Sequence, residues 1–157
     1  MAHRAECNKI VAPMPTATTP GAVLRALKRD AKRLVDAGEK PLVALGSLIN
    51  AVPLAVLVAD DHAHYVLANA RAARFIGYSD RELRRLSVWD LTPGSAEHDF
   101  EVLWRAFIQE GKQRGRYKLV TKTGTIITAD YAALANVLPH LHVSVLRFHG
   151  QRSRNKR

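Results

Sequence analysis

The stretch YVLANARAARFIGYSDREL, Tyr65–Leu83, decides the fold of this chain. It begins with a short β-type run. The next residue, Asn69, has a side-chain oxygen that suits the N-cap of a helix, where it accepts a hydrogen bond from a free backbone amide. Gly77 ends that helix, because glycine adopts the left-handed conformation that many helix ends require. Ser79 and Glu82 then have the spacing of a capping box, which predicts a second short helix.

The same ordered pattern continues beyond this stretch. The segments that follow are WDLTP (89–93), a long helical stretch, GRYKL (115–119), KTGT (122–125) and NVLPHLHVSVLR (136–147). In this order the chain resembles a PAS domain over residues 42–148. The resemblance implies an α+β fold, with a five-stranded antiparallel sheet and short helices on one face. It also implies a sensor and protein-protein interaction module of bacterial-type signal transduction, with regulation of transcription among its outputs.

Hydrophobic periodicity and turn residues divide this region into predicted elements. We expect strands at 54–59, 64–68, 115–122, 125–135 and 141–148, and helices at 69–75, 79–84, 87–90 and 96–111. Gly124 lies between the third and fourth strands, where a tight hairpin requires a positive φ. No internal repeat is visible.

The N-terminal part of the chain divides into a leader and a helix. Residues 1–20 are rich in proline and threonine without sustained periodicity, which predicts a flexible leader. Over residues 21–40 apolar side chains recur at helical spacing and basic ones fall mostly elsewhere, which predicts an amphipathic helix. We expect its apolar stripe to pack on the domain or on a second copy, the alternative being an anionic membrane surface. The resemblance implies a helix that covers the sheet and helps to form dimers.

The formal net charge of +10 is concentrated at the two ends of the chain. Residues 1–40 carry +4, residues 41–146 carry +1 and residues 147–157 carry +5. The central region is therefore nearly neutral. We interpret residues 149–157 as a basic, solubilising tail, and keep nucleic-acid binding through this tail as an alternative.

Export and membrane insertion find no support in the sequence. Cys7 is the only cysteine, so an internal disulfide is impossible. Charged residues interrupt residues 1–11, which excludes the apolar core of a signal peptide. The 19 residues between Lys40 and Asp60 are uncharged, but Pro53 separates a helix-spaced half from a compact apolar run. We therefore expect a helix followed by a buried strand, no transmembrane span, and a cytoplasmic protein.

PAS domains hold their ligands in a cavity between the sheet and the helices, and the resemblance implies such a cavity here. The positions expected to line it are Val56, Val58, Phe75, Ile76, Val88, Leu91, Phe100, Leu103, Phe107, Tyr117, Leu119 and Val143. Each is also a core residue that a small domain needs to bury. We therefore expect side chains to fill the cavity or to leave room for weak binding of a small ligand only.

The sequence does not identify a cofactor. It excludes chromophores that are attached through a cysteine, and it keeps haem as an alternative. A flavin-cysteinyl adduct requires a reactive cysteine near Val88, and a thioester-linked chromophore also requires a cysteine in the domain. The only cysteine, Cys7, lies in the N-terminal leader, so we exclude both groups. Haem is the alternative, because His98 begins the long helix at a place similar to the proximal iron ligand of oxygen-sensing haem PAS domains. Arg116 lies about one residue out of register with the arginine that meets bound oxygen in those sensors. We predict no other metal site, since the remaining histidines lack a cysteine or carboxylate at ligand spacing.

The residues favour a binding module over an enzyme. The sequence contains no phosphate-binding glycine loop, nucleophile elbow or metal-binding helix motif. We assign His140 and His142 to a turn and a strand, and the two tryptophans to the core. The predicted function is signalling by association, as a homodimer or with a separate PAS-containing kinase or regulator, triggered by a ligand or by the abundance of the partner. The alternatives are a haem or small-ligand sensor that uses the cavity, and a nucleic-acid binder.

Overall fold

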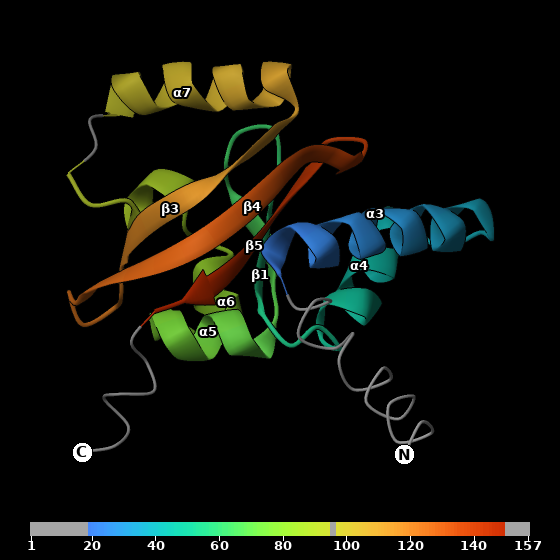
Figure 1. The fold of residues 1–157 in the computed structure, drawn as a ribbon, viewed down its shortest axis with the longest axis horizontal. Helices are drawn as coiled ribbons and strands as arrows, with labels where there is room; N and C mark the ends of the chain where they lie inside the picture. The colour runs from blue at the N-terminus through green and yellow to red at the C-terminus, as the bar shows by residue number, and fades with distance from the viewer. Residues whose placement is uncertain (1–18, 95–96, 150–157) are drawn as a thin grey trace, which may run out of the picture.

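A five-stranded antiparallel sheet forms the centre of the protein (Figure 1). The computed structural model describes residues 19–94 and 97–149. The strands are β1 (Ala55–Ala59), β2 (Tyr65–Ala68), β3 (Lys112–Val120), β4 (Ile126–Leu138) and β5 (Leu141–Phe148), in the order β2-β1-β5-β4-β3. The helices are α3 (Pro20–Asp36), α4 (Pro41–Ile49), α5 (Ala70–Ile76), α6 (Asp80–Leu83), the 3-10 helix η1 (Val88–Leu91) and α7 (Glu97–Glu110). The predicted α+β fold and its antiparallel sheet are confirmed.

The segment from β2 to α6 has the caps that its sequence predicts. Asn69 is the N-cap of α5, and its Oδ1 accepts a hydrogen bond from the Ala72 amide at 3.0 Å. Gly77 follows the helix in the left-handed conformation, with a φ of 92°. Ser79 and Glu82 make both bonds of the capping box at the start of α6. The capping residues of this segment therefore determine where each short helix begins.

Helices cover both faces of the sheet (Figure 1). α3 and α4 pack on one face, where their apolar side chains join Val56, Val58 and Val145 in one core. On the other face α5, α6 and η1 contribute Ile76, Leu83 and Leu91 to a second core, and α7 packs against β3 and β4. The sheet is therefore the middle layer of three.

The predicted amphipathic helix is α3, and it packs on its own chain. Thr19 caps its start, with Oγ1 accepting a hydrogen bond from the Ala22 amide at 3.2 Å. The buried stripe consists of Val23, Leu24, Leu27 and Ala31. It faces β4 and β5, while the basic residues of the helix face solvent. The apolar stripe is thus covered by the sheet and not left for a second copy.

Two glycines set the geometry of the long hairpin. Gly124 has a φ of 91° between β3 and β4, as the sequence predicts. Gly111, with the same φ, ends α7 through a bond from its amide to the Phe107 carbonyl at 2.8 Å. The chain therefore turns directly into β3, which begins three residues earlier than residue 115, the predicted start.

The predicted leader, apart from its last two residues, and the basic tail beyond His149 lie outside the described residues. Within the described part of the chain, no helix has both the length and the apolar character that crossing a bilayer requires.

Candidate functional site

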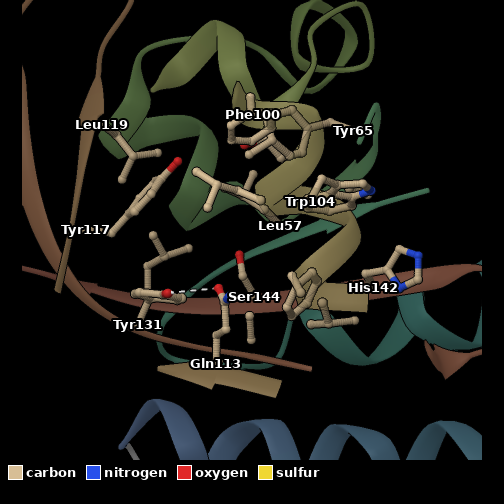
Figure 2. A pocket seen from close by; sticks show the side chains of 17 residues that line it. Leu57, Tyr65, Phe100, Trp104, Gln113, Tyr117, Leu119, Tyr131, His142 and Ser144 are labelled. Atoms are coloured by element: carbon tan, nitrogen blue, oxygen red, sulfur yellow. Dashed lines mark hydrogen bonds between the residues drawn. The ribbon is translucent and has the colours of Figure 1, made fainter. Parts of the chain in front are cut away.

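A cavity of about 210 Å³ lies between α7 and the sheet (Figure 2). Its wall is mostly apolar. From α7 come Phe100, Leu103, Trp104 and Phe107. From the strands and η1 come Leu57, Ala59, Tyr65, Val88, Gln113, Tyr117, Leu119, Tyr131, Ala133, His142, Val143, Ser144 and Leu146. The cavity therefore has the concave, largely apolar character of a small-molecule site.

The structure places several of the sequence-predicted positions on this wall. They are Val88, Phe100, Leu103, Phe107, Tyr117 and Leu119. Val143 also borders the cavity, but it pairs with Val58 and its side chain belongs to the core beneath α3 and α4. Each comes from η1, α7, β3 or β5, elements whose packing against one another forms the cavity. A binding role for these side chains stays a prediction.

Val56 and Val58 lie on the opposite face of the sheet, which corrects their assignment to the cavity. They pack in the core beneath α3 and α4. The strand β1 is buried on both faces, so its sequence contains no polar alternation to show which side faces the cavity. Leu57 and Ala59, at the alternate positions, line the wall instead.

Phe75, Ile76 and Leu91 also lie away from the wall. The ring of Phe75 packs against Phe148 with 4.7 Å between centroids. Ile76 and Leu91 are fully buried within the core beneath the short helices. These three side chains pack among the short helices and the sheet, and none of them borders the cavity.

Arg116 points away from the cavity. Its side chain is 70% exposed and its Nε lies 3.5 Å from Asp130 Oδ1. Tyr117 and Leu119 line the cavity from the same strand, and alternation along β3 places Arg116 on the other face between Gly115 and Tyr117. The hydrogen bond from His149 and the nearby Arg116 guanidinium hold the pKa of Asp130 below its usual value.

The described residues do not fit a haem group. Pockets for drug-sized ligands have volumes of about 300–1,000 Å³, and this cavity has only about 210 Å³. His142, the histidine on the wall, uses both ring nitrogens in bonds to protein atoms. His98 lies in the first turn of α7, but its side chain is outside the described part of the structure. No group of three or more metal-ligating side chains occurs within residues 19–94 and 97–149.

Three tyrosine hydroxyls supply polarity to the wall. The Tyr131 hydroxyl donates to Gln113 Oε1 at 3.3 Å, and the Tyr117 hydroxyl bonds the hydroxyl of Thr92. Tyr65 is only 6% exposed. Burial raises the pKa of all three phenols, most strongly that of Tyr65. The wall therefore presents neutral hydroxyls at physiological pH, and among the described side chains no aspartate, glutamate, lysine or arginine borders it.

A polar cluster shares Trp104 and His142 with the cavity wall. We call it the Asp61 cluster, and its members are Asp61, Trp104, Asn136, His140 and His142. The Asn136 amide donates to His142 Nδ1 at 2.9 Å, so the ring proton lies on Nε2, which donates to Asp61 Oδ1 at 2.8 Å. His140 contacts the other carboxylate oxygen at 2.5 Å. The Trp104 indole donates to the Asp61 carbonyl at 3.0 Å. The cluster thereby ties α7 to the β1–β2 and β4–β5 turns.

The two histidine hydrogen bonds hold the pKa of the Asp61 carboxyl below its usual value, with the His142 bond contributing most. The His142 ring also packs edge-on against Trp104, with 5.7 Å between centroids. Sequence reasoning placed His140 and His142 correctly in a turn and a strand, and Asp60 stabilises the turn after β1 by accepting bonds from the His62 and His64 amides. It did not connect the histidines to Asp61, which is about eighty positions away in the chain.

The sequence analysis missed several wall residues. They are Leu57, Ala59, Tyr65, Trp104, Gln113, Tyr131, Ala133, His142, Ser144 and Leu146. Gln113 lies before the predicted start of the third strand at residue 115, so its place on the same face as Tyr117 and Leu119 follows only from the longer observed strand β3. In β5 the polar residues His142 and Ser144 alternate with Val143 and Val145, which was a usable signal, whereas β1 is apolar and buried on both faces and offers none.

Known proteins share this fold. A family model described as the PAS fold matches residues 49–140. Sporulation kinase E of Bacillus subtilis (strain 168) is 20% identical over 92 residues, which cover 59% of this chain and only 12% of the kinase.

Two solved structures have the same architecture. The PAS domain of an HTR-like protein from Haloarcula marismortui matches with a TM-score of 0.58 and 19% identity, over 77% of this chain and 98% of that one. A domain of the sensory box sensor histidine kinase/response regulator from Geobacter sulfurreducens matches with a TM-score of 0.57 and 20% identity, over 64% and 88%. At these identities the structural matches show the fold alone. Because the family model covers more than half of the chain, this protein belongs to the PAS fold family, whose sensory domains occur in bacterial sensor kinases and regulators.

Proposed function

We propose that this protein is a non-catalytic sensory module that binds a small, uncharged and mainly apolar molecule in the cavity beneath α7. The observation that carries the proposal is the cavity itself, with its volume of about 210 Å³ and its apolar wall. An apolar protein cavity of about 150 Å³ is sufficient to hold benzene. A charged ligand is disfavoured, because an ion buried without an opposite charge loses its hydration without compensation.

The helix α7 is the element suited to report whether the cavity is occupied. It supplies Phe100, Leu103, Trp104 and Phe107 to the wall, and it contacts the rest of the described protein mainly through β3 and β4. A ligand shifts the position of such a helix only if it binds one position more tightly than another. The signal would then pass to a second copy of this chain or to a separate PAS-containing kinase or regulator.

Toluene is a suitable first probe, because it is apolar and of the expected size. The Ala133→Leu variant places a larger side chain on the cavity wall, between Gln113 and Ser144 in the sheet. We expect saturable toluene binding to the wild type in an NMR titration of backbone amides, and binding weaker by at least about tenfold in the variant.

The matched control is Ala106→Leu, which adds the same atoms to an exposed position of α7. This control should bind toluene as the wild type does. Equal binding by wild type and Ala133→Leu, or no saturable binding by the folded wild type, would show the proposed site to be wrong.

A further inference from the structure

The Tyr65 hydroxyl differs from the other hydroxyls on the cavity wall. Thr92 Oγ1 donates to the Val88 carbonyl at 2.9 Å, so the hydroxyl of Tyr117 must donate its proton to Thr92. Tyr131 donates its proton to Gln113. The hydroxyl protons of Tyr117 and Tyr131 are therefore both donated to protein acceptors.

The Tyr65 proton has no such acceptor among the described residues. Burial and the proximity of Tyr117 and Asp90 account for its raised pKa, and no hydrogen bond contributes. Every fully buried side-chain polar atom in the described structure has a partner. The unbonded Tyr65 oxygen must therefore border open space, although the residue is only 6% exposed, and the open space beside it is the cavity.

The position of Tyr65 separates it from the more accessible polar groups. In Figure 2, Tyr65 and Phe100 lie at one end of the cavity, and Gln113 and Ser144 lie at the other. Gln113 is exposed to solvent, so water satisfies its amide. The hydroxyl of Tyr65 is therefore the unbonded tyrosine hydroxyl, at the end of the cavity away from Gln113.

We infer that Tyr65 is the anchor of the ligand site, donating a hydrogen bond to a carbonyl or ether oxygen on an otherwise apolar, uncharged molecule. This inference rests on the proposed function and adds the chemical class of the ligand. A phenol is a better donor than acceptor, because its ring withdraws electron density from the oxygen. A hydrocarbon of the same shape leaves the donor unpaired, and a site with an unpaired buried donor discriminates against it.

The test uses two probes of nearly equal shape and two proteins. Acetophenone has a carbonyl oxygen where cumene has a methyl group. The Tyr65→Phe variant removes one hydroxyl that makes no bond within the described protein, so we expect the fold to be retained. Affinities are measured by NMR titration on the same full chain. We expect Tyr65→Phe to weaken acetophenone binding about three- to tenfold and to leave cumene binding unchanged.

The outcomes separate this inference from the proposed function. If cumene binds both proteins and Tyr65→Phe leaves acetophenone affinity unchanged, the anchor is overturned and the cavity site stands. If neither probe binds the folded wild type, both proposals are contradicted. Loss of both probes in Tyr65→Phe also overturns the anchor, since it shows that the ring's packing and not its hydroxyl matters. The Tyr78→Phe variant is the matched control, because it removes a tyrosine hydroxyl from a residue that does not line the cavity, and it should bind both probes as the wild type does.

Discussion

Asp61 is the residue on which three separate parts of the chain converge. Its carboxylate accepts hydrogen bonds from His140 and His142, and its carbonyl accepts one from Trp104. The His142 side chain is only 1% exposed, so its Nε2 proton has no access to water as a substitute partner. The Asp61 carboxylate is therefore needed to satisfy a buried donor.

This arrangement predicts a pH-dependent contribution to stability. The pKa of Asp61 lies below its usual 3.8 in the folded state. A carboxyl with a depressed folded pKa stabilises the fold above its unfolded pKa, and that stabilisation is lost as the pH falls through the folded value. We expect wild type to exceed Asp61→Asn in free energy of unfolding by about 1 kcal/mol at pH 5, a modest figure because the carboxylate is partly exposed.

That difference should shrink between pH 4 and pH 3, as measured by urea denaturation of both proteins. Asp130 and Glu82 also have lowered pKa values, but they are present in both proteins and cancel in the comparison. A difference that is as large at pH 3 as at pH 5 would show that the charge of Asp61 contributes nothing.

Asn69 shows how far a single residue can be predicted. Its role as an N-cap follows from the sequence, because the acceptor and the amide that it bonds lie three positions apart. The same side chain also accepts from the Val56 amide and donates to the Ile49 and Leu54 carbonyls, all within 3.0 Å. These bonds join α4, β1 and α5. They depend on tertiary packing, and no local sequence pattern predicts them.

At the scale of elements, the strands that are buried on both faces were the hardest to orient. The sequence locates β1 to within a residue, but its five residues are all buried and apolar. Assigning Val58 to the cavity was therefore a choice between two equal faces. In β3 the outward residues are charged, and there the alternation correctly separates Tyr117 from its neighbours.

Because α3 packs on its own chain, a mutation in its apolar stripe should change the free energy of unfolding of the single chain. Leu27 is 4% exposed and lies against the sheet of its own chain. We expect Leu27→Ala to lower the free energy of unfolding by about 2–5 kcal/mol, because it leaves a cavity in the core. Lys28→Ala, at an exposed position one residue further on, should change it by less than about 0.5 kcal/mol.

Chemical denaturation at several protein concentrations checks this prediction. If α3 packs within the chain, the loss in Leu27→Ala is independent of concentration. A loss that disappears at high concentration would instead mean that Leu27 packs against a second copy.

At the scale of the whole molecule, the fold was more predictable than the site. Motif order along residues 42–148 was sufficient for the PAS fold, because turns and caps are local signals. The cavity depends on how α7 packs across β3 and β4. The sequence-based expectation, that side chains would fill it or leave room for weak binding only, reflects the apolar character of every candidate. Whether such residues fill a space or border one depends on tertiary geometry that periodicity does not encode.

The total charge of the chain is also a poor guide to the ligand. The net charge of +10 belongs mainly to the chain ends, and none of the described side chains on the cavity wall is an aspartate, glutamate, lysine or arginine. A charge total for the chain thus says little about the ligand. The neutral wall is the feature that limits the ligand to uncharged molecules.

The central claim is that the space beneath α7 is an apolar site open to a small ligand, and a crystal structure under xenon pressure tests it most directly. Xenon occupies apolar cavities without needing a specific hydrogen bond. We predict xenon density in the cavity beside Phe107 and Ala133, and none at that place in Ala133→Leu. An unoccupied, collapsed space in the wild type, with side chains of α7 filling it, would contradict the account.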